Sequence, residues 1–155
     1  MLVKTVSLSG LMRFAREALM ASGVSETDSD VIAQTLVTTD SFGVLSHGTK
    51  NLYQYIQKMQ AGGLNPKAVP TVDAEGPAWA ILNGNQAMGM EKLARELHAA
   101  PRAKGAEQIF LPGEMDWAKH KKAVAEDRLA LTDAMEKNLK ALSEMCAIPI
   151  AINEA

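Results

Sequence analysis

The sequence predicts an α+β fold in which helices dominate and a few short strands form a small sheet. Apolar residues recur at helical spacing through the first 60 residues and again after residue 133. Prolines and glycines interrupt residues 64–84, and short runs of strand-forming residues lie between them. The chain has 155 residues, of which 47% are hydrophobic and 22% charged, so it is long enough for one globular domain with its own core.

The first 63 residues are expected to form three helices. The first begins at Ser7 or Ser9 and ends at Gly23. The second runs from an N-cap at Ser25 to about residue 40, and the short link predicts that these two helices are antiparallel neighbours. Residues 41–48 form a loop, and a third helix around Ile56 ends at residues 62–63, a pair of glycines. The apolar residues that precede the first helix are assigned to no element.

The second half is expected to mix short strands with helices. Strands at residues 71–73 and 79–82 form a hairpin with its turn at Glu75 and Gly76. A helix at 88–100, a strand at 108–111 and a charged helix at 114–127 follow. The last helix begins at a capping box formed by Asp133 and Glu136 and continues to Cys146.

The composition argues against several classes of function. The 16 basic residues nearly balance 18 acidic ones, for a net charge of −2, so a nucleic acid is not an expected partner. One cysteine, Cys146, excludes an internal disulfide and a multi-cysteine zinc site, and the cytoplasm is the default compartment. The histidines lack the spacing of metal ligands, so no metal is expected. The longest uncharged stretch, residues 76–90, is too short to cross a membrane.

A candidate site lies in the loop before the third helix, where Ser46, His47 and Gly48 follow Asp40 and precede Lys50 and Asn51. A histidine exchanges protons near neutral pH, and the start of a helix favours an anionic group. The alternative is structural: Asp40 and Ser46 cap helix ends, and His47 donates to a carbonyl. The basic run at residues 119–122, which contains His120, is expected to be a solvated helix face.

Longer strings surround this cluster. Residues 40–48 read Asp-Ser-Phe-Gly-Val-Leu-Ser-His-Gly, Tyr55 follows, and residues 61–66 read Ala-Gly-Gly-Leu-Asn-Pro. A segment at 84–89 begins and ends with glycine, residues 100–103 read Ala-Pro-Arg-Ala, and residues 109–114 read Ile-Phe-Leu-Pro-Gly-Glu. In this order the strings resemble the malate/L-lactate dehydrogenase family, of the type that includes sulfolactate and ureidoglycolate dehydrogenases and diketogulonate reductase.

The resemblance implies a particular domain organisation. In the family, a large central domain that holds most of the nicotinamide cofactor site stands between two parts of an outer domain. Here residues 1–96 resemble the N-terminal part and residues 97–155 the C-terminal part, so the whole chain is expected to be a single, rejoined outer domain. Domains tolerate such removal where the two ends lie close together at a surface.

The resemblance also implies roles for individual residues. His47 is the proton donor to the carbonyl of a 2-oxo acid, or the base for a 2-hydroxy acid, while hydride moves to or from NAD or NADP. Ser46 and the start of the following helix help to hold the substrate. Many family members have an arginine four residues after the histidine; Asn51 stands there, and Lys50 beside it supplies a point charge. The residues expected to contact the dinucleotide are Gly113, Glu114 and Met115.

Two functions from different classes therefore compete. One is an NAD(P)-dependent 2-hydroxyacid oxidoreductase, which is expected to be inactive in this chain alone because the cofactor domain is missing. The other is a folded scaffold or homodimerisation module derived from that family, since family members resemble dimers. An unrelated helical interaction domain is the third and blander interpretation.

Overall fold

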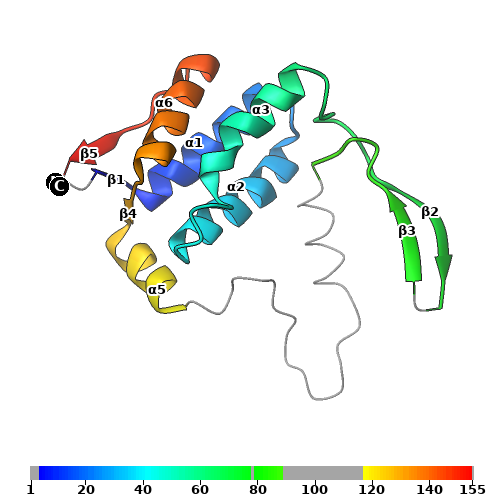
Figure 1. Cartoon of the computed structure of the whole chain (residues 1–155), viewed down its shortest axis with the longest axis horizontal. Coiled ribbons are helices and arrows are strands. Elements are labelled where there is room, and N and C mark those ends of the chain that lie inside the picture. Colours follow the sequence, from blue (N-terminus) through cyan, green and yellow to red (C-terminus); the bar gives the residue numbers. More distant parts are fainter. Residues whose placement is uncertain (1–3, 78, 89–116, 155) are drawn as a thin grey trace.

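A computed structural model describes residues 4–77, 79–88 and 117–154, and it confirms a helix-rich α+β fold (Figure 1). In chain order the elements are β1 (Lys4–Val6), α1 (Leu8–Ala21), α2 (Glu26–Ser41), the short 3-10 helix η1 (Thr49–Asn51), α3 (Leu52–Gln60), β2 (Thr71–Gly76), β3 (Trp79–Asn83), α5 (Trp117–Glu126), β4 (Leu129–Ala130), α6 (Asp133–Cys146) and β5 (Ile152–Glu154). The expected helix at 88–100 and strand at 108–111 lie outside the described residues, apart from Met88.

Side-chain caps set where the helices begin. The hydroxyl of Ser7 accepts from the amide of Gly10 at 3.1 Å, and that of Ser25 accepts from the amide of Asp28 at 3.2 Å, which confirms both expected starts. The start of α6 differs by one residue from the predicted capping box. Thr132 is its N-cap and accepts from the amide of Met135 at 3.3 Å, while Asp133 lies in the first turn.

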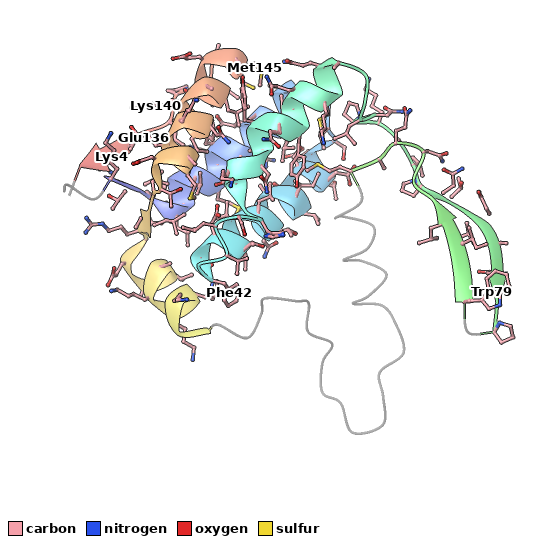
Figure 2. The ribbon with its side chains drawn as sticks, viewed as in Figure 1. Lys4, Phe42, Trp79, Glu136, Lys140 and Met145 are labelled. Carbon is pink, nitrogen blue, oxygen red and sulfur yellow. The ribbon has the colours of Figure 1, made fainter. Side chains whose placement is uncertain are left out.

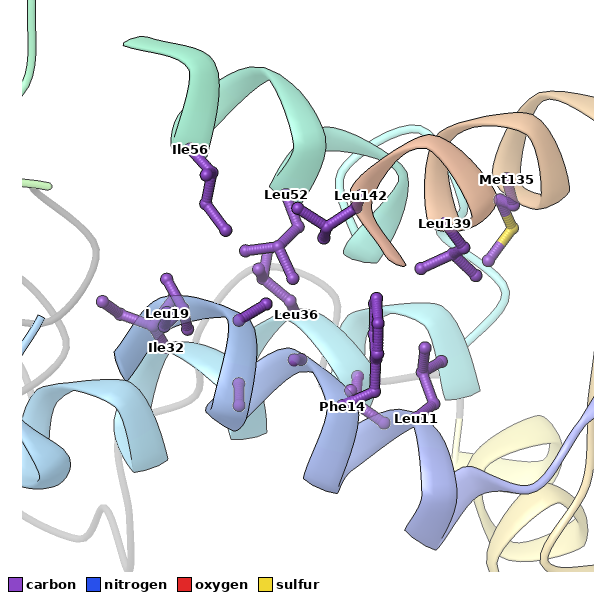
Figure 3. Close-up of a cluster of buried hydrophobic side chains, with 14 of the residues drawn as sticks. Leu11, Phe14, Leu19, Ile32, Leu36, Leu52, Ile56, Met135, Leu139 and Leu142 are labelled. Atoms are coloured by element: carbon purple, nitrogen blue, oxygen red, sulfur yellow. The ribbon is translucent and has the colours of Figure 1, made fainter. Parts of the chain in front are cut away.

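One hydrophobic core joins α1, α2, α3 and α6 (Figure 3). Leu11 and Phe14 of α1, Leu36 of α2, Leu52 of α3 and Leu139 of α6 are each at most 1% exposed. The helix expected from residue 25 to 40 does lie against the first helix, as the short link between them predicts. The core takes side chains from both ends of the sequence, and its side chains lie between α1 and α2 on one side and α3 and α6 on the other (Figure 3).

A three-stranded antiparallel sheet, in the order β4-β1-β5, was not among the predicted elements. Lys4–Val6, directly before the first helix, form its central strand, in which Thr5 lies opposite Ala130 on one side and Asn153 on the other. Beside it, Lys4 contacts Glu136 of α6 at 2.8 Å. The strands have two or three residues each, so they give almost no alternating pattern in the sequence.

The predicted hairpin is present, with longer strands and a shifted turn. β2 and β3 pair antiparallel, and Gly76 lies opposite Trp79, so the turn follows Gly76 instead of beginning at Glu75. The pairing is irregular between Val72 and Ala74. The hairpin stands away from the helices (Figure 1), and every side chain of β3 is exposed.

Within the described ranges, none of the helices is long and apolar enough to span a membrane.

Candidate functional site

The loop between α2 and η1 presents His47 to solvent. Gly43, with φ of +82°, turns the chain away from α2, and the backbone amide of His47 donates to the carbonyl of Val44 at 3.0 Å. The side chains of Ser46 and His47 are both exposed, and Ser46 Oγ lies 2.8 Å from His47 Nδ1 in a hydrogen bond. The ring of His47 therefore has one nitrogen held by its neighbour.

Asp40 lies beneath this loop, in the last turn of α2, and is only 1% exposed. Its Oδ2 accepts from the amide of Thr49 at 2.9 Å and from the hydroxyl of Thr49 at 2.6 Å. Among the described residues, its Oδ1 has no hydrogen-bond donor. Burial raises the pKa of Asp40 to about 6, although the two bonds from Thr49 act in the opposite direction.

These contacts change two expectations about the loop. Asp40 does bond to the start of the following helix, as the structural alternative proposed, whereas Ser46 bonds to the ring of His47 instead of capping a helix. The amide of Thr49, the first residue of η1, is already taken by a carboxylate. That amide is therefore not open to a substrate, and the expectation that this helix start helps to hold one stays a prediction.

Gly48 is in direct contact with the Asp40 carboxylate. A Cβ atom at residue 48 would lie 1.8 Å from Asp40 Oδ1, a distance that no real Cβ contact shows. The φ of Gly48 is −93°, which any residue adopts. Glycine is therefore required here by the lack of space beside Asp40 and not by an unusual backbone angle.

Two amide side chains hold the far side of the loop. Asn51 Nδ2 donates to the carbonyl of Ser46 at 2.9 Å, and Asn138 of α6 donates to the carbonyl of Lys50 at 2.7 Å. Asn51 thus serves the loop backbone. The side chain of Lys50 is half-buried beside it.

His120 is a second histidine near the loop, although the basic run that contains it predicts a solvated face. Ser41 donates its hydroxyl proton to the carbonyl of Thr38 at 2.6 Å, so its oxygen accepts from His120 Nδ1 at 2.7 Å. The ring of His120 also stacks on Phe42, with centroids 4.7 Å apart. Helix α5 is thereby attached to the end of α2, and a basic run gives no sequence signal for such a contact.

The structure thus places the four predicted substrate and catalytic residues side by side, Ser46 and His47 in the loop and Lys50 and Asn51 in η1. The predicted cofactor residues, Gly113, Glu114 and Met115, lie outside the described residues. In the described part of the chain, no cluster of three or more His, Cys, Asp or Glu side chains could hold a metal ion.

A shallow cavity of about 280 Å³ lies elsewhere, between α6 and the small sheet, and is lined by Lys4, Glu136, Lys140, Ser143, Glu144, Ile150 and Ile152. Figure 2 shows Lys4, Glu136 and Lys140 together at this end of the molecule, away from Phe42. Lys140 and Lys4 hold the pKa of Glu136 below its usual range.

The fold and the loop together define a helix-rich α+β domain that presents an exposed histidine above a buried acid. The sequence profile described as malate/L-lactate dehydrogenase matches residues 6–91, which is more than half of the chain. The chain therefore belongs to the malate/L-lactate dehydrogenase family, as the strings around His47 predict.

Individual relatives agree. A malate dehydrogenase from Pyrococcus horikoshii is 35% identical over 79 residues, which are 51% of this chain and 22% of that protein. An L-sulfolactate dehydrogenase from Methanocaldococcus jannaschii is 36% identical over 83 residues, which are 52% of this chain and 24% of the relative. The structure of the Pyrococcus horikoshii malate dehydrogenase superimposes with a TM-score of 0.58 at 32% identity, over 61% of this chain and 27% of that one. The match spans about a quarter of the length of these relatives.

Proposed function

We propose that this chain carries the substrate-binding and proton-transfer part of an NAD(P)-dependent 2-hydroxyacid oxidoreductase, with His47 as the proton donor to a 2-oxo acid. The observation that carries the proposal is the exposed imidazole of His47, held by Ser46 at 2.8 Å on a loop fixed from below. Family membership supports the reaction class.

The pairing with Ser46 suits this role. When Nδ1–H of the ring donates to the Ser46 hydroxyl oxygen, Nε2 is the nitrogen that gains or releases the exchanged proton. A carbonyl oxygen gains negative charge as the carbon beside it is reduced, and the imidazolium form of His47 supplies the proton from Nε2. In the opposite direction, neutral His47 accepts the proton of the substrate hydroxyl at the same atom.

Lys50 is the residue of this loop that can attract the carboxylate of a 2-oxo acid. Its ammonium is a point charge and cannot clamp a carboxylate through two parallel bonds as arginine does. The substrate is therefore proposed as a class, small 2-oxo or 2-hydroxy acids, and no single member of that class is selected.

The dinucleotide does not fit the described helix start beside His47. The amide of Thr49, where a phosphate group would be expected to bind, is occupied by the buried carboxylate of Asp40. NAD or NADP would supply hydride when bound. The family resemblance assigns part of its site to Gly113, Glu114 and Met115 and most of it to a central domain that this sequence lacks. We therefore expect the 155-residue chain to show no turnover by itself.

The test is NMR of the histidine rings while oxamate, a stable analogue of pyruvate, is added. We expect saturable shifts of the His47 signals, a weaker response in Lys50→Met, and an unchanged response in the control Lys58→Met. In parallel, NADH and NADPH are titrated by fluorescence and mixed with pyruvate or oxaloacetate. If oxamate leaves His47 unaffected, the proposed substrate role is wrong. Saturable NADH binding with turnover would instead show that the chain holds the cofactor.

A second candidate is a homodimerising scaffold without catalysis, and the hairpin favours it. Trp79 and Ile81 are each 56% exposed, and Val72 and Leu82 nearly half exposed, on a two-stranded sheet that stands away from the described helices (Figure 1). Such a hairpin is only marginally stable alone in water, so pairing with the hairpin of a second copy would stabilise it. The single cysteine supports a reducing, cytoplasmic location for either function.

A further inference from the structure

Asp40 is unusual among the acidic residues that the structure describes because it is almost completely buried. It is 1% exposed, and in the described residues it forms no ion pair. A serine, threonine or asparagine also accepts a hydrogen bond at a helix start, without a charge that must lose its water. Burial of an acid at this position therefore calls for an explanation beyond capping.

The contacts of Asp40 all lead to the backbone that follows His47. The carboxylate accepts both hydrogen bonds that Thr49 offers, at 2.9 and 2.6 Å. Its other oxygen fills the space beside Gly48, where even a methyl group would collide. One side chain thus fixes the two residues after His47 against the last turn of α2.

From these contacts we infer that Asp40 is a positioning residue for His47, because it holds the Gly48–Thr49 backbone and through it the Ser46–His47 pair. This inference rests on the proposed function, because His47 needs positioning only if it transfers a proton. The structural link between Asp40 and the ring of His47 can be tested separately. Asp40 does not touch the substrate. It acts through the loop.

The geometry separates this role from a purely structural one. An asparagine has the shape of Asp40 and keeps one oxygen to accept from Thr49, whereas an alanine keeps neither. Asp40→Ala should therefore release the loop, and Asp40→Asn should retain it. The exposed Asp73→Ala on the hairpin removes one negative charge far from the loop, and it should leave the tautomer ratio of His47 unchanged.

The experiment records long-range ¹H–¹⁵N spectra of the imidazole rings, which report the tautomer ratio of His47. In the wild-type chain we expect a larger share of the Nδ1–H tautomer than in free histidine, because Nδ1–H then donates to Ser46 Oγ. In Asp40→Ala the ratio should move toward that of free histidine, whereas Asp40→Asn and Asp73→Ala should resemble the wild type. Thr49→Val, which removes only the hydroxyl donor, should cause a smaller shift in the same direction.

The outcomes distinguish this inference from the proposed function. If Asp40→Ala does not fold, the tautomer ratio in Thr49→Val decides whether Asp40 positions His47. An unchanged tautomer ratio in the folded alanine variant, or in Thr49→Val when the alanine variant is unfolded, overturns the positioning role. A wild-type chain in which oxamate does not affect His47 but Asp40→Ala shifts the tautomer ratio would retain the positioning role and reject the substrate role.

Discussion

At the scale of single residues, the side chain of Asp40 leaves no space for a Cβ atom at residue 48, so a glycine is required there. The glycine in Ser-His-Gly is visible in the sequence, but its reason is not, because its φ of −93° is ordinary. The burial of Asp40 is equally hidden, since an aspartate at the end of a helical pattern is usually solvated. The sequence therefore predicts the loop and offers Asp40 as a helix cap, and the structure adds the burial of Asp40 and its contact with Gly48.

Gly48→Ala should destabilise the protein by about 1–3 kcal/mol, because the added methyl group must displace a buried carboxylate. Gly84→Ala is the matched control, since a Cβ there meets nothing within 4 Å. Urea unfolding at neutral pH measures both free energies of unfolding. Adding Asp40→Ala to Gly48→Ala should recover part of the loss. Equal stability of the two single variants would show that the contact imposes no constraint.

The raised pKa of Asp40 predicts a pH-dependent stability. The folded chain holds its proton up to a pH of about 6, whereas the unfolded chain loses it near 3.8. Between these values the folded state binds more protons, so the contribution of Asp40 to stability falls as pH rises from about 4 to 6 and is constant above. A difference of roughly two pKa units corresponds to about 3 kcal/mol.

Asp40→Asn removes this ionisation and is therefore expected to be more stable than the wild type at pH 8 and equally stable near pH 4. The comparison is made as a difference between the two proteins, because Asp127 and Glu136, whose pKa values are lowered, add a pH dependence of opposite sign to both. Thermal or urea unfolding across this range measures it. A variant that is less stable at pH 8 would show that the ionised carboxylate stabilises the fold.

At the scale of elements, the sequence predicts best those helices and strands whose apolar repeat is long and whose contacts are local. Helices α1, α2 and α3 repeat apolar residues over several turns. Serine N-caps precede α1 and α2, and glycines follow α1 and α3, so the sequence predicts these helices well. The strands β1, β4 and β5 are too short for a pattern, and their pairing joins residues more than 120 positions apart. The attachment of α5 through His120 depends on Ser41 and Phe42, which no local rule connects to it.

The exposed hairpin predicts self-association. If two copies pair through their hairpins, Ile81→Lys should raise the dimer dissociation constant at least about tenfold, because a buried charge at such a contact is costly. Val124→Lys on α5, where the valine is 53% exposed, is the matched control and should have no effect. Sedimentation velocity over a range of concentrations measures both. A wild-type chain that is monomeric at every concentration would remove the support for the dimer.

At the scale of the whole molecule, two distant parts of the sequence share one core. Residues 4–88 supply α1, α2 and α3, whereas residues 117–154 supply α6 and two strands of the three-stranded sheet. Periodicity indicated which faces are apolar, but it could not show that β1 pairs with both β4 and β5. The expectation of one domain built from an N-terminal and a C-terminal part stays a prediction, and it can be tested directly.

Neither residues 1–88 nor residues 117–155 should fold alone, because each would expose its half of the shared core. Leu139 and Leu142 on α6 are completely buried, and without α6 the apolar faces of α1 and α3 lose the helix that covers them. Mixed in equal amounts, the two fragments should regain helical circular dichroism and a cooperative thermal transition, with the midpoint rising with concentration. Leu139→Ala in the shorter fragment should weaken the recovery, whereas the exposed Lys137→Ala should not. Independent cooperative unfolding of residues 1–88 would show that the two parts are separate domains.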